Sequence, residues 1–182
     1  MRALVLASTA LLFAATASHA GVSTYGGSFA RACYDAAENR TTSLDAVTSC
    51  DTALAVQNLS EHDRMATHVN RGIIHMLRHE SDLALSDYDT AIRMDARHPE
   101  AYLNKGVMAF DAGDVATAVQ LAEKSLALGT TKPALAYYIR AMAQEQSGNV
   151  KAAYADLLKA SQLAPTWGLP RQDLKRYQVL SR

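Results

Sequence analysis

The sequence predicts an all-α protein built from stacked pairs of antiparallel helices. The first observation is a repeat, because residues 68–72 (HVNRG) recur 34 positions later as residues 102–106 (YLNKG), with a weaker copy at 137–141. The second is composition: 49% of residues are hydrophobic but only 7% are aromatic, which suits closely packed helices better than a sheet. The third is a set of apolar residues at helical spacing on both sides of each copy.

Length and charge exclude some function classes. A chain of 182 residues is long enough for one domain or a short repeat array. Its 18 basic and 18 acidic side chains leave no net charge. This balance disfavours a general nucleic-acid binder, which carries a basic excess.

Residues 1–20 have the layout of a secretory signal peptide. Arg2 precedes an apolar run over residues 3–17, and small residues close the segment at Ser18 and Ala20. A membrane anchor is the alternative, but it requires about 20 strongly apolar residues, and this run is shorter and contains Ser and Thr. We expect cleavage after Ala20, a periplasmic or secreted protein, and no membrane span after signal cleavage. Residues 21–28 read as a flexible leader.

Turn residues separate the expected helices. Glycines suit helix ends that need a left-handed residue, Ser and Asp suit N-caps, and proline suits the first turn of a helix. The residues expected in these three roles are, respectively, Gly113 and Gly148, Ser81 and Asp114, and Pro99 and Pro133.

Small residues recur in each unit at spacings of about 12 and then 7 positions. The three sets are Gly72, Ala84 and Ala91, then Gly106, Ala118 and Ser125, then Ala141, Ala153 and Ala160. This pattern, with Pro165 closing the last unit, resembles the tetratricopeptide repeat (TPR) family. The resemblance implies a right-handed solenoid over residues 29–168. It has three clear repeats (65–98, 99–133 and 134–167), one degenerate N-terminal repeat (29–60) and a capping helix at 169–182.

The two cysteines that follow the predicted signal peptide, Cys33 and Cys50, fall in the degenerate repeat. In the repeat register they occupy facing positions on its two helices. An even cysteine count in an exported protein favours a disulfide, and two separate buried thiols are the alternative.

The resemblance also implies a binding groove on the concave face, formed by the first helix of each unit. Asn70 and Asn104 occupy a position at which TPR proteins often hydrogen-bond a bound peptide backbone. The groove would be lined by Ile73, Val107, Phe110, Tyr138 and Met142. The alternative is that both amides cap or solvate this face while the apolar side chains pack on the adjacent unit. Glu100 stands where carboxylate-binding TPR grooves carry a basic residue, so binding of a chaperone tail is not expected.

Two groups of possible metal ligands do not form a convincing site. His68, His75 and His79 share one helix face but extend too far along it to meet at one ion. Asp87, Asp89 and Asp95 have helical rather than loop spacing, so we read them as a solvated face. We therefore predict no metal and no cofactor.

No catalytic motif is present in the sequence, so we do not expect an enzyme. The leading hypothesis is a non-catalytic module that binds a protein or peptide segment in the groove. A structural accessory subunit or chaperone, docking through its convex or C-terminal surface, is the alternative. An unrecognised enzyme or metal carrier is a third possibility, and nothing in the sequence supports it.

Overall fold

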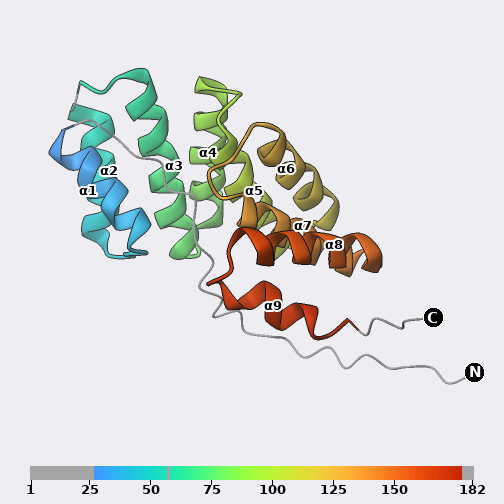
Figure 1. Ribbon diagram of the computed structural model, residues 1–182. Helices are drawn as coiled ribbons and strands as arrows, with labels where there is room; N and C mark the ends of the chain where they lie inside the picture. The colour runs from blue at the N-terminus through green and yellow to red at the C-terminus, as the bar shows by residue number, and fades with distance from the viewer. Residues whose placement is uncertain (1–26, 57, 178–182) are drawn as a thin grey trace, which may run out of the picture.

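The computed structural model describes residues 27–56 and 58–177, and this part of the chain forms nine α-helices (Figure 1). The first eight form four antiparallel pairs in chain order, and the ninth follows the last pair. Their bounds are α1 Ser28–Glu38, α2 Leu44–Val56, α3 Glu61–Leu77, α4 Ser81–Met94, α5 Pro99–Asp111, α6 Val115–Ala127, α7 Pro133–Gln146, α8 Val150–Leu163 and α9 Gly168–Leu174. None of these helices is long and apolar enough to cross a membrane. The predicted signal peptide and residues 21–26 lie outside the described residues.

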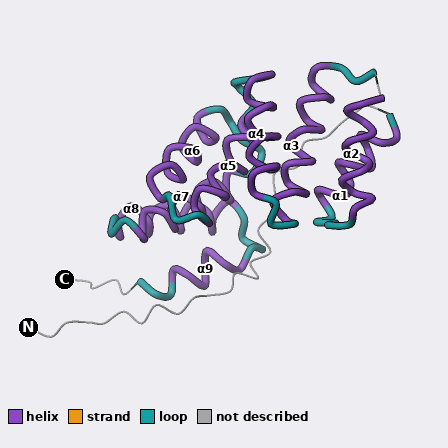
Figure 2. The backbone as a smooth tube through the Cα atoms, turned by 180° about the vertical axis from the view of Figure 1, so that it is seen from behind, coloured by secondary structure: helices purple, strands orange, loops and turns teal. Residues whose placement is uncertain are grey.

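The pairs stack into a two-layered array (Figure 2). Each helix packs most extensively on the partner of its own pair, and consecutive pairs meet through α2 and α3, α4 and α5, and α6 and α7. The first helices also contact one another in sequence, α1 with α3, α3 with α5, and α5 with α7. They therefore form one layer, called here the first-helix face. The predicted all-α, TPR-like arrangement of helix pairs is confirmed.

Small residues lie where the two helices of a pair cross. Ala84, Ala91, Ala118, Ala122, Ala141, Ala153 and Ala160 are all completely buried. Gly72 on α3 shows why size matters, because a Cβ added there would lie 2.6 Å from Cε1 of Tyr88 on α4. Only glycine lets the two helix backbones approach with this tyrosine between them.

Most of the predicted turn residues have the expected roles. Gly113 and Gly148 have φ of +80°, and Asp114 accepts a hydrogen bond from the Thr117 N–H at the start of α6. Pro99 and Pro133 stand in the first turns of α5 and α7.

The N-cap predicted at Ser81 is wrong, because the cap is Glu80 and Ser81 is the first helical residue. The carboxylate of Glu80 does not cap α4, since it bonds His75 and Arg78 instead. His79 supplies the left-handed turn residue at this connection, with φ of 61°.

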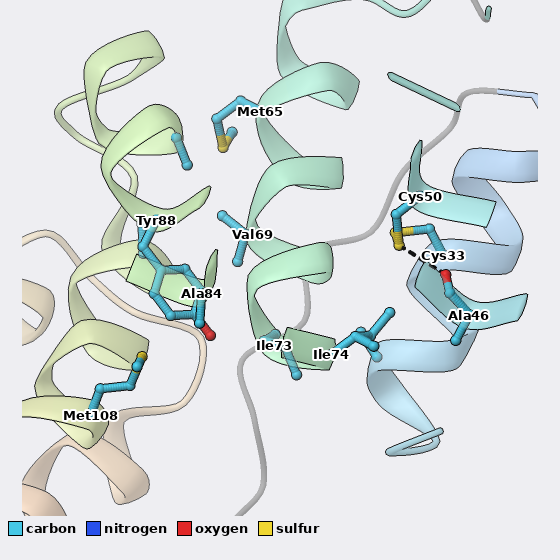
Figure 3. Packing of buried hydrophobic residues seen from close by; sticks show 13 residues of the cluster. Cys33, Ala46, Cys50, Met65, Val69, Ile73, Ile74, Ala84, Tyr88 and Met108 are labelled. Atoms are coloured by element: carbon cyan, nitrogen blue, oxygen red, sulfur yellow. Dashed lines mark hydrogen bonds between the residues drawn. A yellow bond between two sulfur atoms is a disulfide. The ribbon is translucent and has the colours of Figure 1, made fainter. Parts of the chain in front are cut away.

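A disulfide joins Cys33 on α1 to Cys50 on α2 (Figure 3). Both half-cystines are completely buried and belong to the same apolar cluster as Val69, Ile73 and Ile74 of α3. The disulfide therefore joins the two helices of the first pair within the apolar layer on which α3 packs.

The C-terminal end is covered by a short helix rather than by the longer one predicted. The helix α9 ends at Leu174, and residues 178–182 lie outside the described residues. Leu174 and Tyr177 pack on the apolar cluster of the last pair. The hydroxyl of Tyr138 on α7 donates a 2.8 Å hydrogen bond to Asp173 on α9, and the Tyr138 ring lies 4.9 Å from that of Trp167.

Candidate functional site

The two predicted anchor residues occupy equivalent places in the first-helix face. Asn70 lies on α3 and Asn104 lies on α5, each two residues before the glycine of its repeat. Both side chains are completely buried, with no exposed surface. A partner could therefore reach either amide only after a local rearrangement of this face.

The apolar residues predicted to line the groove are also largely buried. Val107, Tyr138 and Met142 expose 9%, 5% and 7% of their surface, and they share one cluster against which Phe110 packs. Ile73 belongs to the other large cluster, with α1, α2 and α4. The structure thus brings four of the five apolar residues together and separates Ile73 from them.

The C-terminal ends of α3 and α5 are the more accessible part of the first-helix face. Met76 and Leu77 on α3 and Phe110 on α5 are half-buried, and each packs on a core cluster through part of its surface. Met76 contacts both large clusters, so it lies at the junction between the second and third pairs. These three side chains offer apolar surface that a partner can contact without disturbing the core.

Glu100 stabilises the connection between α6 and α7. Its Oε1 accepts 2.9 Å hydrogen bonds from the Thr131 backbone N–H and hydroxyl, and a longer one from the Thr130 hydroxyl. The carboxylate is buried and holds the connection between α6 and α7 against the start of α5. It does not present a charge on the first-helix face.

A buried carboxylate organises the second pair. Arg71 donates from Nε and Nη2 to the two oxygens of Asp87, at 2.8 and 2.7 Å, and His68 lies 2.8 Å from Oδ1. Asp87 is only 4% exposed, so the prediction that it belongs to a solvated face is wrong. Burial by itself would raise the pKa of Asp87, but the hydrogen bonds from Arg71 and His68 hold that pKa below its usual value.

His75 and Glu80 extend this polar cluster to the turn. The His75 ring lies 2.6 Å from Glu80, whose other oxygen accepts from Arg78. The hydrogen bonds from Arg78 and His75 lower the pKa of Glu80 to about 2. His68 and His75 thus each bond a carboxylate. No three His, Cys, Asp or Glu side chains of the described residues form a group able to hold a metal.

A ladder of ion pairs connects consecutive repeats. The cation that precedes the small residue of each first helix reaches an acid on the second helix of the preceding pair. The pairs are Arg71 with Asp51, Lys105 with Asp89, and Arg140 with Glu123. The signal that could have located the ladder is the cation at the same place in all three copies.

The small residues and the ion pairs thus recur at equivalent positions in successive helix pairs. Residues 134–166 are a tetratricopeptide repeat, since the model of that family matches them. The match covers α7 and α8, with their small residues Ala141, Ala153 and Ala160. No curated protein matches the chain.

The tetratricopeptide repeat is typical of non-catalytic modules that bind other proteins. The units at 65–98 and 99–133 have the same helix–turn–helix arrangement as the matched TPR unit, with the same small-residue positions. A protein-interaction module is therefore the functional class that this architecture indicates.

Proposed function

We propose that this protein is a non-catalytic interaction module that binds a protein or peptide segment on its first-helix face, in the cell envelope. The observation that carries the proposal is the parallel placement of α3, α5 and α7, which brings equivalent residues of successive TPR-like units into one row. An extended segment crossing these helices would meet the same kind of surface in each unit.

The chemistry of this face fits a segment with apolar side chains. Met76, Leu77 and Phe110 supply half-exposed apolar contacts, and methionine adapts well to irregular partners. Asn70 and Asn104 lie beneath this surface and carry both a donor and an acceptor, as a peptide backbone requires. In this proposal they are deep anchors, reached when the partner displaces local packing.

The envelope location rests on two features of different kinds. The N-terminal sequence has the layout of a signal peptide, and the Cys33–Cys50 disulfide suits an oxidising compartment.

Docking through another surface is a second candidate, favoured by one observation. Three large apolar side chains near the starts of second helices are exposed to solvent. They are Leu44 on α2, Leu83 on α4 and Val150 on α8. They recur at the same end of three of the four second helices. An accessory subunit or chaperone would bury such an edge against a larger partner.

Affinity capture from an envelope extract separates the two candidates. The bait is the oxidised protein beside the Asn70→Ala/Asn104→Ala and Met76→Ser/Phe110→Ser variants, with Leu83→Ser/Val150→Ser for the edge. Because buried polar side chains stabilise the fold, Thr67→Val serves as a matched control: Thr67 is equally buried on α3, and its hydroxyl donates to the Asp63 carbonyl of the same helix. A partner lost only with the first two variants supports the first-helix face. A partner lost only with the edge variant would overturn that proposal.

A further inference from the structure

A hollow lies at one end of the second pair, where α3 begins and α4 ends. Its volume is about 370 Å³, and five side chains line it: Glu61, His62, Met65, Met94 and Asp95. Every one of the five carries an atom that can bind a metal ion, namely two thioethers, one imidazole and two carboxylates. Among the described residues that line it there is no lysine or arginine.

The antiparallel pairing of α3 and α4 brings these donors together. The first turn of α3 lies beside the last turn of α4, so residues about 30 positions apart in sequence face one space. His62 and Met65 are three residues apart and share a helix face. Met65 is only 2% exposed and reaches from α3 toward α4 (Figure 3), whereas Met94 is 39% exposed at the end of α4. One thioether therefore forms the floor of the hollow and the other its rim.

The charges around the hollow favour a cation. Within the described residues Glu61 and Asp95 form no salt bridge, although one oxygen of Asp95 accepts the backbone N–H of Arg97 at 2.8 Å. The Asp95 carboxylate interacts electrostatically with His98, but neither carboxylate has a lysine or arginine partner in this part of the chain, and this leaves a negative rim over a neutral, polarisable floor.

The donor types decide which cation fits. Nitrogen and oxygen donors do not suffice, because no three His, Cys, Asp or Glu side chains in the described part of the chain form a metal-binding group. Magnesium and calcium need oxygen ligands, and zinc needs nitrogen, oxygen or thiolate ligands. Thioethers bind soft ions, of which Cu(I) is the biological example. The sulfur atoms of Met65 and Met94 thus select against the hard and borderline ions.

We propose that this hollow binds one soft monovalent cation, Cu(I) or its analogue Ag(I), through the thioethers of Met65 and Met94 and the imidazole of His62. Glu61 and Asp95 supply negative charge at the rim. The site is separate from the first-helix face and does not depend on the proposed function. It also departs from the sequence expectation of no metal, which considered only the histidine and aspartate groups.

Calorimetric titration with Ag(I) in chloride-free nitrate buffer tests the site, using the protein with its disulfide intact. Silver needs no reductant, so the cysteines stay paired and cannot bind it. We expect one equivalent to bind more tightly than about 1 µM, and the Met65→Leu/Met94→Leu variant to bind about 100-fold more weakly. His62→Gln should weaken binding by about 10-fold. Zn(II) and Ca(II) should not bind in this range.

The matched control is Met76→Leu/Met142→Leu, which removes two methionines outside the hollow and should leave binding unchanged. Leucine keeps the volume of methionine, so both variants should fold, and a thermal melt checks this. Spectra of ¹³C-labelled methionine methyl groups give a second readout, in which only the Met65 and Met94 signals should shift on Ag(I) addition. Absence of binding tighter than 10 µM, or equal binding by the two double variants, would overturn the proposal.

Discussion

The second and third helix pairs have the same framework of small residues but fill it differently. In the second pair Gly72 faces Tyr88, a fully buried ring that leaves no space for a Cβ. In the third pair the residue at the place of Tyr88 is Ala122, and a Cβ on Gly106 would lie 3.3 Å from Cβ of Leu121. The comparison teaches that the two positions act together, because a larger residue on the second helix requires a smaller one on the first.

The ion pairs within the second and third helix pairs also differ. Sixteen residues after the cation of the first helix, the second pair has Asp87, the fourth has Asp156, and the third has Leu121. Arg71 and Arg140 each bind the carboxylate of their own pair with two hydrogen bonds. Lys105 has no such partner and reaches back to Asp89 instead. The second pair is therefore joined by a buried ion pair that the third pair lacks.

Removing the buried carboxylate of the second pair should cause the largest loss of stability. Asp87→Ala leaves His68 without its carboxylate partner and leaves Arg71 with only the more exposed Asp51, and we expect a loss of about 3–5 kcal/mol in the free energy of unfolding. Urea denaturation followed by circular dichroism measures it. The control is Asp89→Ala, which removes a half-exposed acid and should cost less than about 1 kcal/mol. Equal losses in both variants would contradict the distinction.

The disulfide comes next in expected effect, because it supports the second pair from one side and has no counterpart beside the third. Cys33→Ala/Cys50→Ala opens a loop of 17 residues and should lower the free energy of unfolding by about 3 kcal/mol. Hydrogen exchange shows where the loss falls: we expect faster exchange in α1–α3 and little change in α5–α6. Uniform acceleration along the chain would mean that the pairs unfold as one unit.

Alanine at the two glycines tests the packing difference directly. Gly72→Ala forces a Cβ against the Tyr88 ring, and we expect a net loss of about 1–3 kcal/mol. Gly106→Ala meets only a close contact with Leu121 and gains up to about 1 kcal/mol of helix propensity, so it should be near neutral. Thermal melts compare the two.

A rescue variant sharpens this prediction. Adding Tyr88→Leu to Gly72→Ala recreates the pairing of Ala141 with Leu157 found in the fourth pair. Part of the lost stability should return. If Tyr88→Leu does not recover any of it, the contact between ring and Cβ is not the cause of the loss.

Lowering the pH should have the smallest of these effects on the stability of the second pair. The pKa of Asp87 is lower in the folded protein than in the unfolded chain, and that of Glu80 is lowered to about 2. The unfolded state therefore binds protons first as the pH falls, so stability is present above about pH 4 and declines below it. Urea midpoints between pH 5 and 2.5 measure the slope. Asp87→Asn should flatten it, and an unchanged slope would assign the acid sensitivity to other carboxylates.

Much of the local structure could be predicted because it depends on neighbours in sequence. Gly113 and Gly148 were predicted as left-handed turn residues, since only glycine adopts that conformation without cost. Pro99, Pro133 and Asp114 mark helix starts for equally local reasons. The prediction for Ser81 is wrong by one position, because the Glu80 N–H bonds the His75 carbonyl and so ends the turn after α3 directly before Ser81, and a capping pattern does not show this contact.

The candidate site could be predicted only as a set of positions. The repeat register placed Asn70 and Asn104 on equivalent helices, but it could not show that both are completely buried. Nor could it show that Asp87 turns inward, because that depends on Arg71 and His68 reaching it from α3.

By itself the sequence determined the helix pairs, their turns and their register, and with them the facing positions of Cys33 and Cys50. These follow from backbone preferences and from a period of about 34 residues, which act over short distances along the chain. Only the tertiary structure decided which charged groups are buried, which glycine faces a tyrosine, and that Met65 and Met94 line one hollow. Those outcomes depend on side chains that approach from different helices, and their burial and charge exist only once the helices have packed.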